Sequence, residues 1–153
     1  MKVTKAKTED IRGLIPVAVE WRKTCNGKGF GIDLVLETHL SDLAGLIERD
    51  DADLLLLSND KDEIVGYMGL ICFSSPVGNQ KIAEEHYWFV AGRSRGRGTM
   101  LLIRKAKEWA KEKGCSHIIF NASNLASNMH DKICVFYKKI GLRKFETSFI
   151  GRI

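Results

Sequence analysis

The chain has 153 residues, of which 44% are apolar and 28% are charged, and its formal net charge is +5. This is the composition of an ordinary globular domain, and the low proline content excludes long disordered tracts. No apolar run approaches the roughly eighteen residues of a membrane span, and residues 1–7 carry no apolar signal-peptide core, so we expect a single cytoplasmic domain over residues 1–153 with no membrane partner.

Apolar periodicity predicts a strand and two helices in the first third of the chain. The expected elements are a strand over residues 2–7, a helix over residues 8–19, a loop over residues 23–31 and a helix over residues 37–49. Thr8 is the expected N-cap of the first helix, because acidic residues follow it in the first turn. Pro16 falls inside the same pattern, so this helix is expected to bend or to restart there.

The rest of the chain predicts antiparallel strands followed by alternating helices and strands. The expected elements are strands over residues 53–58 and 63–73 that form a hairpin, a strand over 81–90, a helix over 99–113, a strand over 117–121, a helix ending near Ile140 and one or two strands over 142–153. This order predicts the α+β class, with a mixed and mostly antiparallel sheet flanked by helices.

A turn rich in glycine and arginine joins the predicted strand over 81–90 to the predicted helix over 99–113. Its members are Gly92, Arg93, Ser94, Arg95, Gly96, Arg97 and Gly98. The first amides of a helix have no internal partners, and glycine lets a ligand approach the backbone, so such a turn suits a diphosphate. The alternative is an ordinary surface turn with solvated arginines. The spacing of the common P-loop and that of the Rossmann dinucleotide fingerprint are both missing.

Two motifs carry a resemblance to a known family. The run from Arg93 to Gly98 fits the pattern Gln/Arg-x-x-Gly-x-Gly/Ala, and the run from Phe136 to Leu142 fits an aromatic-Tyr-x-x-x-Gly-Phe/Leu element. Together they resemble the GNAT superfamily of N-acetyltransferases over essentially the whole chain. A frame that begins at Arg95 is an alternative, but it places Met100 where Gly or Ala is expected. His130 stands where relatives place an asparagine before Tyr137.

The resemblance implies a GNAT fold, with a six- or seven-stranded sheet, about four flanking helices and a splay after the fourth strand. It also implies acetyl-CoA, that is coenzyme A carrying the acyl group, as the donor. The pantetheine arm is expected along the backbone of Phe89, Val90 and Ala91. The phosphates are expected at the turn and helix start, which comprise Arg93, Ser94, Arg95, Gly96, Arg97, Gly98 and Thr99.

Three side chains are candidates for proton transfer. Glu84 ranks first as the base for two reasons. Alternation predicts that it shares a strand face with His86, Trp88 and Val90, opposite Glu85, and it lies six residues before Val90, where the resemblance implies a glutamate that draws the proton off through a water. His86 is the second candidate, since histidine titrates near neutral pH. The resemblance implies that Tyr137 returns a proton to the CoA thiolate. The structural alternatives are solvated strand residues for the first two and a packed aromatic anchor for Tyr137.

The sequence therefore predicts an N-acetyltransferase that moves an acetyl group to a primary amine by direct transfer in a ternary complex. The expected acceptor is a small-molecule or peptide amine, and the expected state is a monomer or homodimer. Neither nucleic acid nor a metal is expected, because the basic residues cluster locally and the four cysteines lack zinc-site spacing. The alternatives are a non-catalytic acyl-CoA sensor or partner-binding module on the same fold, and a nucleic-acid binder.

Overall fold

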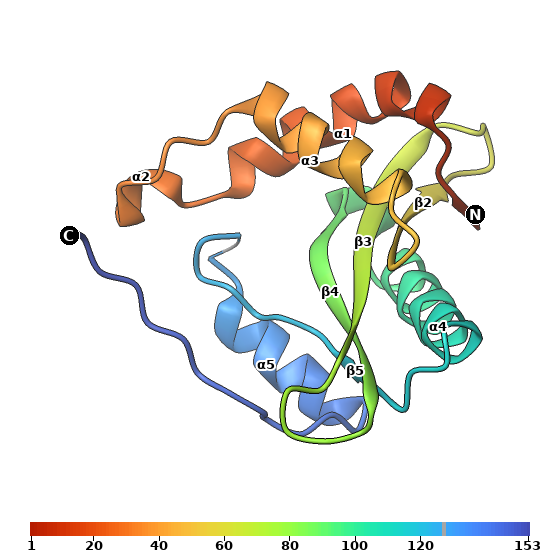
Figure 1. The fold of residues 1–153 in the computed structure, drawn as a ribbon. Coiled ribbons are helices and arrows are strands. Elements are labelled where there is room, and N and C mark those ends of the chain that lie inside the picture. The colour runs from red at the N-terminus through yellow and green to blue at the C-terminus, as the bar shows by residue number, and fades with distance from the viewer. Residues whose placement is uncertain (127) are drawn as a thin grey trace. The chain divides into compact units, whose positions relative to one another are not determined.

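The computed structural model describes residues 1–126 and 128–153 (Figure 1). These residues group into two compact units. One comprises Met1–Arg22 and Val35–Asn121, and the other comprises Lys23–Leu34 and Ala122–Ile153. The single domain expected over residues 1–153 therefore stays a prediction, and each unit is described by itself.

The larger unit is built on one five-stranded sheet in the order β1-β2-β3-β4-β5. The strands are β1 Lys2–Lys5, β2 Ala52–Ser58, β3 Ile64–Ser74, β4 Lys81–Val90 and β5 His117–Ile119. Neighbouring strands are antiparallel except β4 and β5, which are parallel. This confirms the predicted mixed, mostly antiparallel sheet. The strand count is lower than the six or seven expected, because residues 142–153 form no strand and expose Phe145 and Phe149.

Five α-helices occur in the described residues, which is close to the number expected. They are α1 Ile11–Thr24, α2 Gly27–Phe30, α3 Leu36–Ile47, α4 Arg97–Glu112 and α5 His130–Lys139, with 3-10 turns η1 Thr8–Asp10 and η2 Gly92–Ser94. The short α2 lies in the segment predicted as a loop. Thr8 was wrong as the N-cap: Lys7 takes that position, and its amide donates to the Asp10 carboxylate over 2.8 Å.

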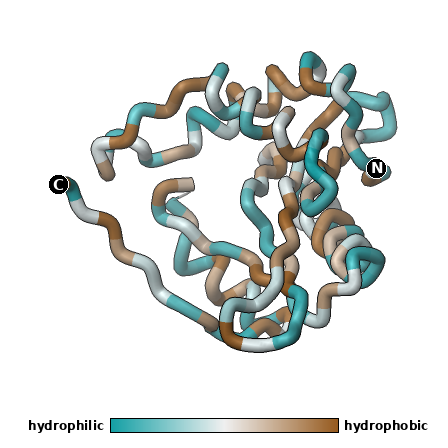
Figure 2. The backbone as a smooth tube through the Cα atoms, in the orientation of Figure 1, coloured by the Kyte–Doolittle hydropathy of each residue, from teal (hydrophilic) through white to brown (hydrophobic). Residues whose placement is uncertain are grey.

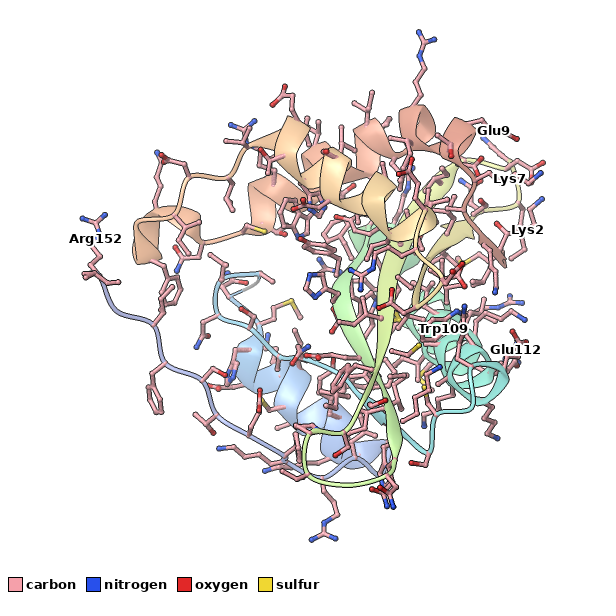
Figure 3. All side chains as sticks on the ribbon, viewed as in Figure 1. Lys2, Lys7, Glu9, Trp109, Glu112 and Arg152 are labelled. Atoms are coloured by element: carbon pink, nitrogen blue, oxygen red, sulfur yellow. The ribbon has the colours of Figure 1, made fainter. Side chains whose placement is uncertain are left out.

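Helices α3 and α4 pack on the sheet of the larger unit (Figure 1). Trp109 of α4, labelled in Figure 3, is fully buried and its indole Nε1 donates to Asp53 Oδ2 of β2 over 2.6 Å. On α3, Leu43 and Leu46 are buried. Apolar and polar residues are interspersed along both helices (Figure 2). This spacing is the amphipathic pattern from which both helices were predicted, with an apolar stripe on each helix that faces the sheet.

Strand β4 runs past its parallel partner. Pairing with β5 covers only Ile82–Glu84, whereas pairing with β3 extends to Val90. Among the described residues, the stretch Glu85–Val90 therefore has no strand partner on its β5 side. The separation of β4 from β5, expected after Val90, begins after Glu84.

A β-bulge at His86 changes which side chains share a face of β4. Glu85 pairs with Leu70 and Tyr87 pairs with Gly69, so His86 is the extra residue in the ladder. Because one inserted residue reverses the alternation that follows it, Glu85 shares a face with Trp88 and Val90. The expectation that Glu84 shares this face was wrong.

Candidate active site

The glycine- and arginine-rich turn folds as a 3-10 turn followed by the start of α4. Gly96 is the N-cap and has φ +77°, a conformation that glycine adopts without steric cost. The amide of Met100 makes an intrahelical bond to Gly96 O over 3.1 Å. The amides of Arg97, Gly98 and Thr99 precede that bond, so they lie at the positive end of the helix without an intrahelical acceptor.

Gly98 brings the start of α4 into close contact with the sheet. A Cβ atom at this position would lie 2.6 Å from Leu57 Cδ2 and 3.6 Å from Val90 Cγ1. A larger residue at this position would therefore have to displace the buried Leu57 side chain.

The three arginines of the turn have exposed side chains, but they differ in their contacts. Arg95 Nε donates to the Val90 carbonyl over 3.1 Å. Ser94, between Arg93 and Arg95, is buried, and its amide donates to Ala91 O over 2.8 Å. Arg93 and Arg97 extend from the turn into solvent, where they add positive charge beside the amides of α4.

The end of β4 presents main-chain groups on its open side. Phe89, Val90 and Ala91 are all buried, and the Ala91 amide donates to Val65 O of β3 over 2.9 Å. Since main-chain directions alternate along a strand, the N–H and C=O of Val90 point away from β3. The Val90 carbonyl is the acceptor for Arg95, so an arginine occupies part of the edge at which pantetheine was expected.

Glu20 of α1 contacts the same turn, which the sequence did not predict. Its Oε1 accepts the Gly92 amide over 3.1 Å. The partners are seventy-two positions apart, and no local pattern links a glutamate on one helix to a glycine after a distant strand. This contact ties α1 to the turn that precedes α4.

The candidate Glu84 and its neighbour Glu85 both contact Asn121, which follows β5. Asn121 donates from its main-chain amide to Glu85 Oε2 over 3.0 Å, and its Nδ2 donates to Glu84 Oε1 over 3.1 Å and to Glu85 O over 2.7 Å. Glu84 is half-buried and Glu85 is buried. Burial raises the pKa of Glu85 to about 7; the hydrogen bond from the Asn121 amide partly opposes this rise, and the Glu84 charge adds a smaller rise. His86, on the bulge, is exposed and its ring centroid lies 4.7 Å from that of Tyr87.

An aromatic and histidine cluster lies between α1, α3 and the sheet, and sequence reasoning missed it as a unit. His39 Nε2 lies 2.8 Å from the Tyr67 hydroxyl, and the Trp21 ring stacks on His39 with centroids 3.8 Å apart. Burial lowers the pKa of His39 to about 4, against a weaker opposing effect of Asp42, so this imidazole is neutral near pH 7. The Tyr87 hydroxyl donates to Asp42 Oδ2 over 3.1 Å.

Tyr137, the expected acid, lies in α5 of the smaller unit. Its side chain is buried, and its carbonyl accepts the Leu142 amide over 2.9 Å where Gly141 turns with φ +86°. Its ring centroid lies 5.8 Å from that of Phe136. The helix and its glycine stop therefore fold as the second motif predicts.

Two kinds of feature are missing from residues 1–126 and 128–153. No helix there is both long and apolar enough to span a bilayer. No group of three or more histidine, cysteine or acidic side chains is arranged there to hold a metal ion.

Several solved structures share this fold over nearly their whole length. A ribosomal-protein-alanine N-acetyltransferase from Brucella melitensis matches with a TM-score of 0.74 and 16% identity, and both chains are covered completely. An aminoglycoside 6'-N-acetyltransferase from Acinetobacter haemolyticus matches with a TM-score of 0.74 and 17% identity, over 100% of this chain and 99% of that one. A transcriptional regulator from Bacillus halodurans matches with a TM-score of 0.75 and 16% identity, over 99% of both chains. At such identities these likenesses show the fold alone.

Sequence comparison identifies the family. No curated protein matched the chain in sequence. The family model described as the acetyltransferase (GNAT) family matches residues 16–141, which include the turn, β4, the end of β5 and α5. The chain therefore belongs to the GNAT family of acetyltransferases.

Proposed function

We propose that this protein is an N-acetyltransferase that moves the acetyl group of acetyl-CoA to a primary amine by direct transfer in a ternary complex. The observation that carries the proposal is the start of α4, where the amides of Arg97, Gly98 and Thr99 adjoin the open edge of β4. A diphosphate at these amides would leave the rest of the cofactor free to extend along that edge. Membership of the GNAT family supports the same assignment.

The proposed cofactor contacts are mostly main-chain contacts. The amides at the start of α4 and the turn formed by Ser94 and Gly96 hold the diphosphate, and Arg93 and Arg97 add charge at the rim. The pantetheine arm lies along Phe89, Val90 and Ala91 as an added strand would. Because Arg95 donates to the Val90 carbonyl, a pantetheine amide would replace the guanidinium there and free Arg95 for a phosphate.

The proposed reaction forms a C–N bond and breaks a C–S bond. The neutral amine attacks the thioester carbonyl, and the negative charge on the carbonyl oxygen is stabilised by the Val90 amide on the open edge of β4. Glu84, directly or through a water, takes the proton that the amine loses. The tetrahedral intermediate then expels the thiolate of CoA, and the Tyr137 hydroxyl protonates the sulfur. His86 is the second candidate for the base.

A non-catalytic acyl-CoA sensor is the second candidate function. The observation that favours it is that one neighbour with this fold is a transcriptional regulator. A sensor would bind CoA through the same turn and would release no thiol with any amine.

The test combines calorimetric titration with CoA and a thiol-release screen with acetyl-CoA across small amines, peptide N-termini and lysine peptides. We expect CoA binding and thiol release with at least one amine class. CoA binding with no thiol release would leave the sensor, and no CoA binding would overturn both. The variants Arg93→Ala and Arg97→Ala should weaken CoA binding, whereas Lys28→Ala, a surface basic residue of α2, serves as the charge-matched control.

A further inference from the structure

Asn121 holds two consecutive acidic residues of the neighbouring strand at once. It follows β5, and its contacts reach both the side chain and the main chain of β4. The main-chain amide holds the Glu85 carboxylate over 3.0 Å, and Nδ2 holds Glu84 Oε1 over 3.1 Å. Glu84 and Glu85 are adjacent in sequence but lie on opposite faces of β4. Asn121, at the edge of the strand, therefore contacts both carboxylates.

The chemistry of the asparagine side chain suits this arrangement. Nδ2 carries two N–H groups, and it makes two contacts, one to Glu84 Oε1 and one to the Glu85 carbonyl over 2.7 Å. The second contact anchors the amide to main chain that is itself paired with β3. The first contact then fixes one oxygen of Glu84, so the carboxylate cannot rotate freely.

The position of Asn121 in the topology adds a second argument. The β4 and β5 ladder ends at the pair of Glu84 and Ile119. Beyond it, the Asn121 side chain takes the Glu85 carbonyl that a longer β5 would have used. Asn121 thus follows the end of the parallel pairing and holds the side chain of Glu84, the last paired residue, where the open edge of β4 begins.

We propose that Asn121 is a positioning residue that orients the Glu84 carboxylate toward the open edge of β4, where the amine loses its proton. The main-chain carbonyl of Glu85 anchors the Asn121 side chain in this arrangement. The inference rests on the proposed function, because it assigns Asn121 to the base of that reaction. A purely structural Asn121 would support the strand end and would leave the chemical step unchanged.

The kinetic test uses Asn121→Asp, which keeps the shape and the main-chain amide but removes the Nδ2 donor, and Asn121→Ala. We expect kcat to fall by roughly 10- to 100-fold, as for other misplacements of a catalytic group, with the KM for acetyl-CoA unchanged within about twofold. The control is Ser116→Ala, because the Ser116 hydroxyl contacts the Lys81 carbonyl at the other end of the β4 and β5 pairing. Equal losses in Asn121→Ala and the control, or an unchanged kcat in Asn121→Asp, would overturn the proposal.

Two carboxyl variants separate the roles of the acids. Glu85→Gln keeps an acceptor for the Asn121 amide and should retain most of kcat, whereas Glu84→Gln should lose it. The opposite ranking would make Glu85 the base and would overturn the assignment to Glu84.

A spectroscopic arm does not depend on turnover. In a proton–nitrogen NMR spectrum, Glu84→Ala should move the Asn121 side-chain amide signals, and the same change at the exposed Glu112 of α4 should not. Signals that stay in place would show that the contact does not form. If the wild-type protein releases no thiol with any amine, the proposed function fails; if it is active and Asn121→Asp is equally active, only this inference fails.

Discussion

Replacing Glu85 by glutamine should change how the stability of the protein depends on pH. Glu85 is buried, and burial raises its pKa from 4.5 to about 7. A raised pKa means that the folded protein holds this proton more tightly than the unfolded chain. The stability that the protonated carboxyl contributes is fully present below about pH 4.5 and is lost as the pH rises to about 7.

The size of this loss follows from the pKa change. A rise from 4.5 to about 7 corresponds to roughly 3 kcal/mol of unfolding free energy. Glu85→Gln has nearly the same shape, accepts the Asn121 amide through its carbonyl oxygen and cannot ionise. Relative to wild type, the variant should therefore gain roughly 3 kcal/mol between about pH 4.5 and pH 7.

The assay must compare the two proteins at each pH, because His39 acts in the opposite direction. Burial of the neutral imidazole lowers its pKa from 6.5 to about 4. The folded protein therefore loses stability relative to the unfolded chain as the pH falls from about 6.5 to about 4. The two slopes partly cancel in wild type. Urea unfolding of wild type and Glu85→Gln across this range isolates Glu85, since His39 is common to both.

A difference in unfolding free energy that stays flat from pH 4.5 to 7 would refute a pKa of Glu85 raised by burial. Glu84→Gln gives a further check on the cause. Because the Glu84 charge raises the pKa of Glu85, its removal should move the loss of stability to lower pH. The exposed substitution Glu112→Gln should leave the pH dependence unchanged.

Three other changes test the site. Gly98→Ala should destabilise the protein by about 1–2 kcal/mol in urea unfolding and weaken CoA binding in calorimetry, because its Cβ would lie 2.6 Å from Leu57 Cδ2. The control Gly45→Ala in α3 has open space at its Cβ and should not destabilise the protein. Tyr137→Phe should lower kcat with little change in the KM for acetyl-CoA, and full turnover would remove Tyr137 as the acid. Tyr67→Phe should lower the free energy of unfolding by about 1–3 kcal/mol, because it removes the hydroxyl that lies 2.8 Å from the buried His39 Nε2. An unchanged stability in thermal or urea unfolding would show that this contact contributes nothing.

Periodicity and turn residues predicted most of the fold, because most elements here obey local rules. Strand β4 was predicted with the bounds that it has, and α4 starts two positions earlier than expected, at Arg97 rather than Thr99. The glycine-rich turn was placed correctly between them. These elements depend on apolar alternation, an amphipathic stripe and glycine conformation, all of which are legible over short windows.

The bulge at His86 could not be predicted from the same rules. Alternation along residues 81–90 is satisfied by a regular strand, and the extra residue becomes visible only when Glu85 and Tyr87 take neighbouring partners on β3. Its consequence is large, because it exchanges the faces of the carboxyl groups relative to Trp88. The failure therefore lies in a pairing between strands, which a single strand's pattern does not contain.

The contacts made by Glu20, His39 and Asn121 were missed for a related reason. Each joins residues far apart in sequence: Glu20 to Gly92, His39 to Tyr67, and Asn121 to Glu84 and Glu85. The sequence around a single glutamate, histidine or asparagine does not indicate such a distant partner. Only the topology, which ends β5 beside the middle of β4, brings Asn121 to the carboxylates.

The early end of β5 accounts for several features of the candidate site together. If β5 continued beyond Ile119, its main chain would take the groups of β4 from Glu85 to Val90, and no edge would be open to a ligand. Asn121 follows the last pair, and its side chain donates to the Glu85 carbonyl. Arg95 covers the Val90 carbonyl at the far end of the same edge. The open edge is therefore bounded by the Asn121 contact beside the proposed base and by the Arg95 contact beside the proposed phosphate site.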